Sequence, residues 1–289
     1  MTKVVPDITL LQSLRCPICN KSMDLQGDPT KKETVTLYCH GERRHCYDLA
    51  SSGYVNLMKP GYANGGDSKP AVRARSEFLN LDLYRPAAEA LCEAVCRYVQ
   101  PDGGILIDAG CGEGYYTAML AKHGFTTAGV DLSRFAVDAT AKRISSVGIP
   151  HAFCGVASVF EMPFEDACAS AVVNVFAPCA EAEFTRVLRH GGILAVMYAG
   201  PEHLMGLKQA LYDHTRENDG RADLPTTLPL VEEIRVRFDI TVKGTQNLQN
   251  LFAMTPYYWK TSVSDSEKLL SMEKLTTPVD MIIAIYQKP

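Results

Sequence analysis

The sequence lacks any apolar run close to the roughly 18 residues that cross a membrane. No small-residue cleavage pattern of a secretory signal follows its N-terminus, so we expect a cytoplasmic protein without membrane contact. It also lacks an excess of positive charge, because 29 Lys and Arg residues stand against 33 Asp and Glu residues, a net charge of −4. A nucleic-acid-binding surface would therefore be a local patch.

Basic residues do gather in the first part of the chain, and they form the candidate patch: Lys31, Lys32, Arg43, Arg44, Lys69, Arg73 and Arg75. Ten cysteines in a cytoplasmic protein indicate thiols or metal ligands rather than disulfides. A length of 289 residues with 46% hydrophobic content is typical of one ordinary domain with a smaller one attached.

The chain is organised around residues 105–116, which read Ile-Leu-Ile-Asp-Ala-Gly-Cys-Gly-Glu-Gly-Tyr-Tyr. Three apolar residues lead into Asp108, and Gly110, Gly112 and Gly114 alternate before a helical pattern. The glycines are thus predicted at a strand-to-helix turn, where a ligand can touch backbone. The dinucleotide fingerprint needs its last glycine one position further along, where this chain has Tyr. The stretch therefore favours S-adenosylmethionine over NAD.

A second acid supports this interpretation. Asp131 ends the next apolar run about 20 residues after Gly110, the offset at which a carboxylate meets a ribose in Rossmann-like units. Strand and helix patterns alternate through the rest of the chain and end in two candidate antiparallel strands, 234–242 and 281–286. We therefore predict an α/β fold of class I S-adenosylmethionine-dependent methyltransferases, with a Rossmann-like seven-stranded sheet and a small N-terminal zinc-binding domain.

The zinc prediction comes from Cys16-Pro-Ile-Cys19 and from a second pair about twenty residues later. A Cys-x2-Cys turn points two thiolates at one tetrahedral ion, and Cys39 with His45 would complete four ligands. Alternation over residues 34–38 predicts the strand that presents the second pair. The fourth ligand stays open among three neighbours: His40, His45 and Cys46. A closed four-ligand site would be structural.

Three further positions are candidates for contact with cofactor or substrate. Tyr84 precedes the glycine-rich strand and could bind the carboxylate of the cofactor or only pack. His203, in the loop 200–203, could meet cofactor or substrate. Cys179 follows a buried strand, and Pro178-Cys179 resembles the proline-cysteine of cytosine C5 methyltransferases, whose thiolate attacks the ring. The alternative for Cys179 is a small buried cysteine.

The motifs together identify a resemblance that covers nearly the whole chain. They are Cys16-Pro-Ile-Cys19, Cys39 to His45, Gly53-Tyr-Val-Asn-Leu57, Asp67-Ser68, Arg75 with Phe78-Leu79, residues 108–116, Phe176-Ala-Pro-Cys179, residues 200–205 and Met254-Thr-Pro256. A chain with this set resembles the 23S rRNA (guanine-N1)-methyltransferase family, RlmA/RrmA, which includes TlrB-type members.

The resemblance implies methyl transfer from S-adenosylmethionine to N1 of a guanine in a 23S rRNA hairpin near the peptide exit tunnel, and a homodimer. It implies structural Zn²⁺ on Cys16, Cys19, Cys39 and His45, although five residues separate the last two where the family has three. Implied cofactor contacts are Tyr84, Gly112, Glu113 and His203. The expected domains are a zinc-binding RNA-recognition domain (1–62), a linker with covering helices (63–100) and the methyltransferase domain (101–289).

The target atom determines the chemistry. Guanine N1 carries a proton at neutral pH, and N1 lies on the Watson-Crick edge, so the base must be unpaired or flipped. The sequence leaves the proton acceptor open among Glu113, Glu202 and His203. Two alternative functions also remain: an RNA cytosine C5 methyltransferase that uses Cys179, and a small-molecule methyltransferase with an accessory zinc domain.

Overall fold

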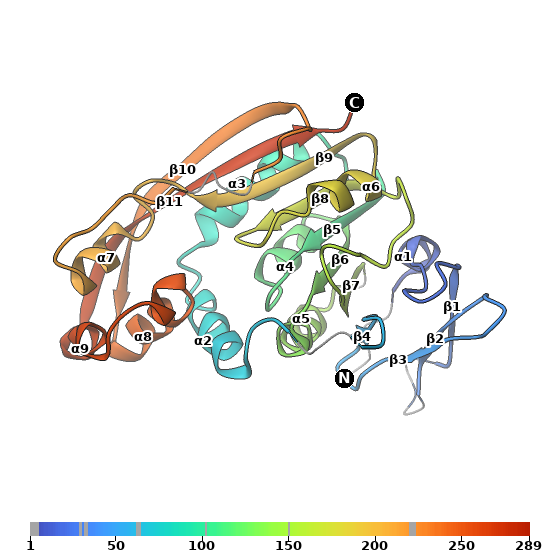
Figure 1. Ribbon diagram of the computed structural model, residues 1–289, viewed down its shortest axis with the longest axis horizontal. Coiled ribbons are helices and arrows are strands. Elements are labelled where there is room, and N and C mark those ends of the chain that lie inside the picture. The colour runs from blue at the N-terminus through green and yellow to red at the C-terminus, as the bar shows by residue number, and fades with distance from the viewer. Residues whose placement is uncertain are drawn as a thin grey trace.

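The computed structural model of the chain describes residues 6–28, 31, 34–61, 65–101, 103–149, 151–219 and 224–289. Figure 1 shows one twisted sheet through the middle of the molecule and a small N-terminal module at one end of its long axis. Within the described ranges, no helix is both long and apolar enough to cross a membrane. The predicted boundary between residues 62 and 63 lies outside the described residues, as does Lys32 of the candidate basic patch.

The N-terminal module consists of one short helix and three strands: α1 (Ile8–Ser13), β1 (Met23–Gln26), β2 (Thr36–Cys39) and β3 (Cys46–Asp48). The side chain of Asp7 caps α1 by accepting a hydrogen bond from the backbone N–H of Leu10. The strands form an antiparallel sheet in the order β1-β2-β3. β2 confirms the strand predicted from the alternation before Cys39.

The large sheet has eight strands in the order β10-β11-β9-β8-β5-β6-β7-β4, one more than expected. Its parallel centre follows the sequence predictions closely: β5 (Ile105–Ala109), β6 (Thr126–Asp131), β7 (Ala152–Val156), β8 (Ala169–Val175) and β9 (Leu188–Ala199). The additional strand, β4 (Val55–Asn56), pairs in parallel with β7. The segment after the module is therefore attached to the large sheet.

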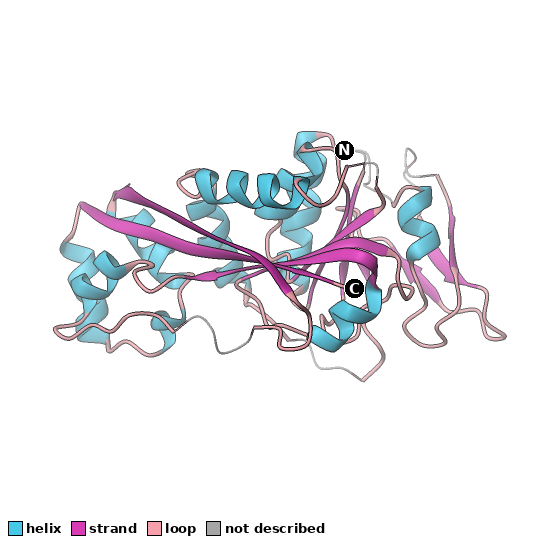
Figure 2. Ribbon diagram, turned by 90° about the horizontal axis from the view of Figure 1, so that it is seen from above, coloured by secondary structure: helices cyan, strands magenta, loops and turns pink. Residues whose placement is uncertain are grey.

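Two long strands complete the other side of the sheet: β10 (Leu230–Lys243) and β11 (Lys274–Gln287). β11 pairs antiparallel with β9, and β10 pairs antiparallel with β11. Figure 2 shows them as a long ribbon that extends away from the N-terminal module. This confirms the two antiparallel strands predicted near the C-terminus.

The helices connect these strands: α2 (Lys69–Leu79), α3 (Arg85–Cys96), α4 (Tyr115–Lys122), α5 (Arg134–Val147), α6 (Glu181–Val187), α7 (Met205–Leu211), α8 (Thr245–Ala253), α9 (Val263–Glu267) and the 3-10 helices η1 (Pro256–Trp259) and η2 (Lys268–Ser271). Ser68 caps α2 and Ser133 caps α5, each with its hydroxyl oxygen. Both helices begin where a serine ends an irregular segment.

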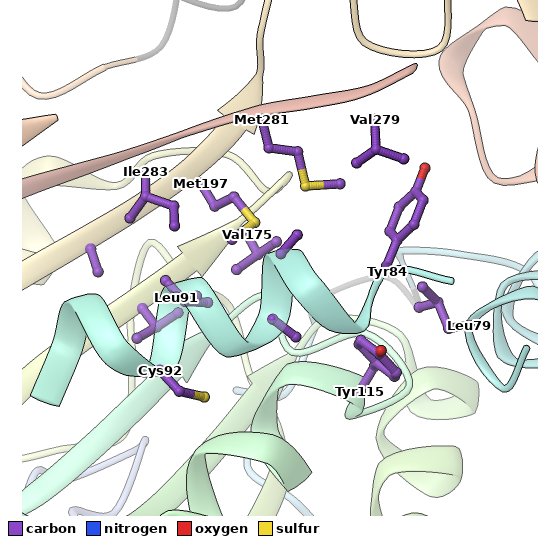
Figure 3. Packing of buried hydrophobic residues seen from close by; sticks show 14 of the residues in the cluster. Leu79, Tyr84, Leu91, Cys92, Tyr115, Val175, Met197, Val279, Met281 and Ile283 are labelled. Atoms are coloured by element: carbon purple, nitrogen blue, oxygen red, sulfur yellow. The ribbon is translucent and has the colours of Figure 1, made fainter. Parts of the chain in front are cut away.

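The two faces of the sheet carry separate cores. Leu106 of β5 packs in one cluster with Leu91 of α3, whereas its neighbour Ile107 packs in a second cluster with Phe184 of α6. Alternate strand residues point to opposite faces, so one apolar run can serve both layers. Figure 3 shows the first cluster, where α3 lies against Met197 of β9 and residues of β11. The sheet therefore lies between two apolar layers.

Candidate functional site

The glycine-rich turn lies between β5 and α4, and it has no room for side chains. Gly110, Gly112 and Gly114 have φ angles of +89°, +56° and +79°, in the left-handed region that favours glycine. A Cβ atom at Gly110 would lie 2.4 Å from Cβ of Ala177, and one at Gly114 would lie 2.7 Å from Cγ2 of Thr140. The turn therefore offers bare backbone to a ligand at the carboxyl edge.

Asp131 lies against this turn at the end of β6. Its carboxylate accepts hydrogen bonds from the backbone N–H groups of Gly112 (3.1 Å) and Ser133 (2.8 Å). Burial raises the pKa of Asp131, and these two hydrogen bonds oppose the shift. A carboxylate has lone pairs beyond these two bonds, which suit the hydroxyl groups of a ribose. The structure thus brings together the two features that the sequence separates by about 20 residues.

Asp108, predicted as a cofactor contact, lies beneath the turn in β5 and is fully buried. Its Oδ2 accepts a 2.5 Å hydrogen bond from the hydroxyl of Thr117 in α4. Burial raises the pKa of Asp108 to about 7, although the Thr117 hydrogen bond acts in the opposite direction. This carboxyl group holds α4 against β5, and its contact with the cofactor stays a prediction.

Glu113 and Arg75 meet above the same turn. Glu113 is 2% exposed, and its Oε2 has no hydrogen-bond partner among the described residues. Nη1 of Arg75, from α2, lies 3.8 Å from that oxygen and would lie 3.5 Å from a Cβ atom at Gly112. Burial raises the pKa of Glu113, and the charge of Arg75 opposes the shift. The pair forms a polar rim over the turn.

The sequence places Arg75 in the basic patch and among the motifs of the resemblance, but it does not predict the contact of Arg75 with the glycine-rich turn. It also pairs with Asp67 in the segment before α2. The signal available in the sequence was an arginine on the helix before Tyr84, in the segment that precedes the glycine-rich strand. A guanidinium beside bare backbone is a suitable partner for a ligand carboxylate.

The segment 66–68 covers this region from the side of α5. A Cβ atom at Gly66, whose φ is +79°, would lie 2.7 Å from the backbone nitrogen of Ser133. The Ser133 hydroxyl donates a 2.7 Å hydrogen bond to the carbonyl of Asp67. The covering segment therefore packs directly beside Asp131.

Tyr84, at the start of α3, and His203, in the loop after β9, lie against each other. Their ring centroids lie 6.1 Å apart in an edge-to-face arrangement. The Tyr84 hydroxyl is buried and has no hydrogen-bond partner among the described residues. Figure 3 shows its ring extending from the start of α3 toward Val279. A buried hydroxyl without a partner suits a polar ligand group.

His203 is held in a defined protonation state. Its Nδ1 accepts a 3.3 Å hydrogen bond from the backbone N–H of Asp280 in β11. Burial lowers the pKa of His203 to about 4, although the nearby charge of Asp280 acts in the opposite direction. The ring is therefore neutral at pH 7 with its proton on Nε2, which can donate a hydrogen bond.

Asp280 also fixes the loop that carries His203. Its buried carboxylate pairs with Arg235 of β10 through contacts of 2.7 Å and 2.9 Å and accepts a 2.9 Å hydrogen bond from the N–H of Glu202. The carboxylate of Glu202 is directed to the arginines of β10, Arg235 and Arg237. Of the three proton-acceptor candidates, Glu202 is thus engaged in ion pairs and His203 is a donor.

The loop after β8 lies against the glycine-rich turn, with Ala177 next to Gly110. Nδ2 of Asn174 donates to the carbonyl of Ala109 (2.9 Å) and to that of Pro178 (3.3 Å), so it ties this loop to the end of β5. Phe176 stacks on His203 with ring centroids 5.6 Å apart and 30° between the planes. Cys179 is partly buried and packs against the core cluster that contains Phe184. That packing is the alternative to its predicted nucleophilic role.

The four predicted zinc ligands converge in the N-terminal module. The Cys16, Cys19, Cys39 and His45 ligand atoms all lie within 4.8 Å of one another. Nδ1 of His45 is 3.5 Å from Sγ of Cys16 and 3.4 Å from Sγ of Cys39, and the sulfurs of Cys19 and Cys39 are 3.6 Å apart. Ligands of one tetrahedral zinc ion lie about 3.5 to 3.7 Å from each other. The donor set and its spacing fit such an ion.

The electrostatics of this cluster favour a thiolate. Burial alone would raise the pKa of Cys39, but hydrogen bonds from the backbone at His45 and Gly41 outweigh it and lower the pKa to about 6. The other candidates for the fourth ligand lie elsewhere: Nε2 of His40 pairs with Asp24 at 2.8 Å, and Cys46 is exposed. The geometry therefore favours His45.

Some residues of the predicted basic patch are engaged in ion pairs with acidic neighbours. Arg73 pairs with Glu77, and Lys31 pairs with Asp28. On the module, the guanidinium of Arg44 lies 3.7 Å from the ring centroid of Tyr38. Arg44 also lines an open hollow, together with Gln26, Gly27, Thr34, Thr36, Cys46 and Asp48. A stacked arginine and an aromatic ring are suited to contacts with nucleic acid.

Comparison with known proteins agrees with this geometry. The family model described as "Methyltransferase domain" matches residues 107–196, from the glycine-rich turn to β9. The chain is 32% identical over 208 residues to the "23S rRNA (guanine(748)-N(1))-methyltransferase" of Streptomyces fradiae, covering 70% of this chain and 69% of the relative.

Two further relatives carry related names. The "Putative 23S rRNA (guanine-N(1)-)-methyltransferase" of Micromonospora griseorubida is 34% identical over 216 residues, covering 70% of each chain. The "Putative 23S rRNA (guanine-N(1)-)-methyltransferase YxjB" of Bacillus subtilis (strain 168) is 29% identical over 292 residues, covering 95% of this chain and 96% of the relative. With its glycine-rich turn, Asp131 and the cysteine-histidine cluster, this chain belongs to the 23S rRNA (guanine-N1)-methyltransferase family.

Proposed function

We propose that this protein transfers the methyl group of S-adenosylmethionine to N1 of a guanine in a hairpin loop of 23S rRNA near the peptide exit tunnel. The observation that carries the proposal is the contact between Asp131 and the glycine-rich turn, in a chain whose relatives bear the names of 23S rRNA guanine-N1 methyltransferases. The contact joins the two sequence features expected to hold a nucleoside cofactor.

The residues around the turn fit S-adenosylmethionine. Asp131 would accept from the ribose hydroxyl groups, and bare backbone at Gly110 would face the methionine portion. Arg75 and the unpartnered hydroxyl of Tyr84 are suited to the carboxylate, and Nε2–H of His203 is a further donor. When bound there, the cofactor supplies a methyl group activated by its positively charged sulfonium.

Guanine supplies a nucleophile only when its N1 proton is removed or loosened. Glu113 is the buried carboxyl group at the turn, and its Oε2 has room for a hydrogen bond. Burial raises the pKa of Glu113, which makes its carboxylate a stronger proton acceptor than an exposed one. We therefore assign the proton-acceptor role to Glu113 in preference to Glu202 and His203.

The module would hold structural Zn²⁺ on Cys16, Cys19, Cys39 and His45. A closed set of four ligands leaves no open coordination position, so the ion stabilises the module and takes no part in the transfer. Held by these residues, the ion would connect the Cys16 turn to β2 and to the segment before β3, next to Arg44 and Tyr38. Residues 1–62 would recognise RNA, 63–100 would cover the cofactor and 101–289 would carry out the transfer.

The remaining assignments are a cytoplasmic location, where 23S rRNA is made and modified, and a homodimer. β10 is an edge strand of the large sheet, so part of its backbone is available to a second copy. Light scattering of the purified protein measures the mass in solution, and a monomer at micromolar concentration would contradict the dimer.

The test is a transfer assay with labelled cofactor on 23S rRNA that carries no modifications, followed by nucleoside analysis by mass spectrometry. We expect 1-methylguanosine, mapped to one hairpin guanosine. Label in 5-methylcytidine would indicate the cytosine C5 methyltransferase. Label only in small molecules would indicate a small-molecule methyltransferase. Either result would overturn the proposal.

A further inference from the structure

Phe176 has an unusual combination of backbone and side-chain properties. Its φ angle is +51°, in the left-handed region where bulky residues are rare and strained. Its side chain is 50% exposed, although the preceding strand β8 is entirely buried. Burial of the ring therefore does not explain why a phenylalanine occupies a position that favours glycine or asparagine.

Three of the five non-glycine residues with positive φ angles in the described part of the chain lie near the proposed site, whereas Asn20 and Ala167 lie elsewhere. Asp82, Phe176 and Leu204 are non-glycine residues with positive φ angles. They lie beside Tyr84, at the end of β8 and beside His203, respectively. Strained residues collect at functional sites because the surrounding structure maintains them for a purpose.

The ring of Phe176 is also well positioned. One face stacks on His203, which Asp280 holds in place. The next residue, Ala177, contacts Gly110 of the glycine-rich turn, and Asn174 ties the loop to the end of β5. The exposed part of the ring therefore stands on a rigid support beside the turn where the cofactor is proposed to bind.

We propose that Phe176 is the platform on which the target guanine stacks, and that it sets the distance of the base from the transferred methyl group. This inference rests on the proposed function. A base lifted out of a hairpin loop loses its neighbours, and an aromatic side chain replaces them with a stacking contact. Phe176 offers such a contact, because its apolar ring is half exposed to solvent and is held by stacking on His203.

The first experiment measures methyl transfer to unmodified 23S rRNA by Phe176→Ala and Phe176→Tyr. Loss of one base stack corresponds to about a 10- to 100-fold lower kcat/KM for RNA in the alanine variant. The tyrosine variant should remain within a few-fold of wild type, and affinity for S-adenosylmethionine should stay within twofold in both. Tyr98→Ala is the control, because Tyr98 is a partly exposed aromatic residue between α3 and β5, at the opposite edge of the sheet.

A second variant separates this role from folding. Phe176→Asn places a residue that tolerates positive φ at this position, so the melting temperature should not fall, while RNA methylation should fall as in the alanine variant. Full kcat/KM in the alanine or asparagine variant would overturn the inference. A loss explained by weaker cofactor binding would also overturn it, because Phe176 would then only close the cofactor site.

A third measurement is independent of methyl transfer. Phe176→Trp introduces a tryptophan whose emission should be quenched by a hairpin RNA with an unpaired guanine, and less by the same hairpin with an abasic site. The wild-type chain, whose one tryptophan is Trp259, is the reference. If the guanine quenches the emission but no 1-methylguanosine forms, the proposed function is refuted and the stacking role of Phe176 stands. If 1-methylguanosine forms but the guanine does not quench the emission, only the stacking role of Phe176 is refuted.

Discussion

The backbone N–H of Asp280 donates a hydrogen bond to Nδ1 of His203, 77 residues earlier in the chain. This contact joins β11 to the loop after β9 and leaves Nε2 of the histidine as a donor. It also means that His203 must remain neutral for the site to keep its geometry, because a proton on Nδ1 would face another donor.

His203 should make the protein sensitive to acid. Burial lowers its folded-state pKa to about 4, below the unfolded value of about 6.5. The neutral ring therefore contributes stability that is present above pH 6.5 and is lost as the pH falls toward 4. Between pH 7 and pH 5 we expect a loss of about 2 kcal/mol from this group. Urea unfolding of wild type and His203→Gln at both pH values measures the difference.

The control for this prediction is His123→Gln, because His123 is exposed at the end of α4. It should lose the same stability as wild type between the two pH values. Equal losses in wild type and His203→Gln would show that His203 is not the residue responsible.

Arg75 should contribute to cofactor binding. Its guanidinium lies over Gly112 and beside Glu113, so Arg75→Gln removes the charge proposed to face the carboxylate. We expect about a tenfold weaker binding of S-adenosylmethionine by isothermal titration calorimetry, since one charged hydrogen bond contributes about 1.5 kcal/mol or more. Arg73→Gln, on the same helix and paired with Glu77, is the matched control. Equal affinities of the two variants would contradict the role of Arg75.

The proposed zinc site should depend on His45 and not on its neighbours His40 and Cys46. Elemental analysis should find about one zinc ion per chain, and none in His45→Ala. His40→Ala and Cys46→Ser should retain the metal, because His40 pairs with Asp24 and Cys46 is exposed. Loss of zinc in either control would reassign the fourth ligand. Chelation should lower the melting temperature of wild type and leave that of His45→Ala unchanged.

Cys179→Ala tests the cytosine alternative. The cysteine packs against the core near Phe184, so its replacement should lower stability by about 1 kcal/mol and leave most of the methyl transfer intact. A covalent mechanism would instead lose all activity. The same RNA assay and nucleoside analysis distinguish the two results, and Cys168→Ala, another partly buried cysteine, is the control for stability.

Local sequence patterns predicted much of this molecule correctly. Short apolar runs located the strands of the large sheet, and the glycines at 110, 112 and 114 located the turn, because each pattern depends on residues that are close in the chain. The cysteine pair at 16 and 19 predicted a cluster of metal ligands, and the structure brings four candidate ligands together there. The sequence did not reveal β4, whose two residues pair with a strand about a hundred positions later.

The sequence by itself determined the parallel sheet, the bare backbone of the turn and three candidate metal ligands, Cys16, Cys19 and Cys39, since periodicity and spacing encode these directly. Only the tertiary structure decided how the catalytic candidates differ. It directed Glu202 to Arg235, made His203 a donor through Asp280, and left Glu113 buried at the turn. The physical reason is that a pKa and a hydrogen-bond partner depend on groups brought together from distant strands, which no local pattern records.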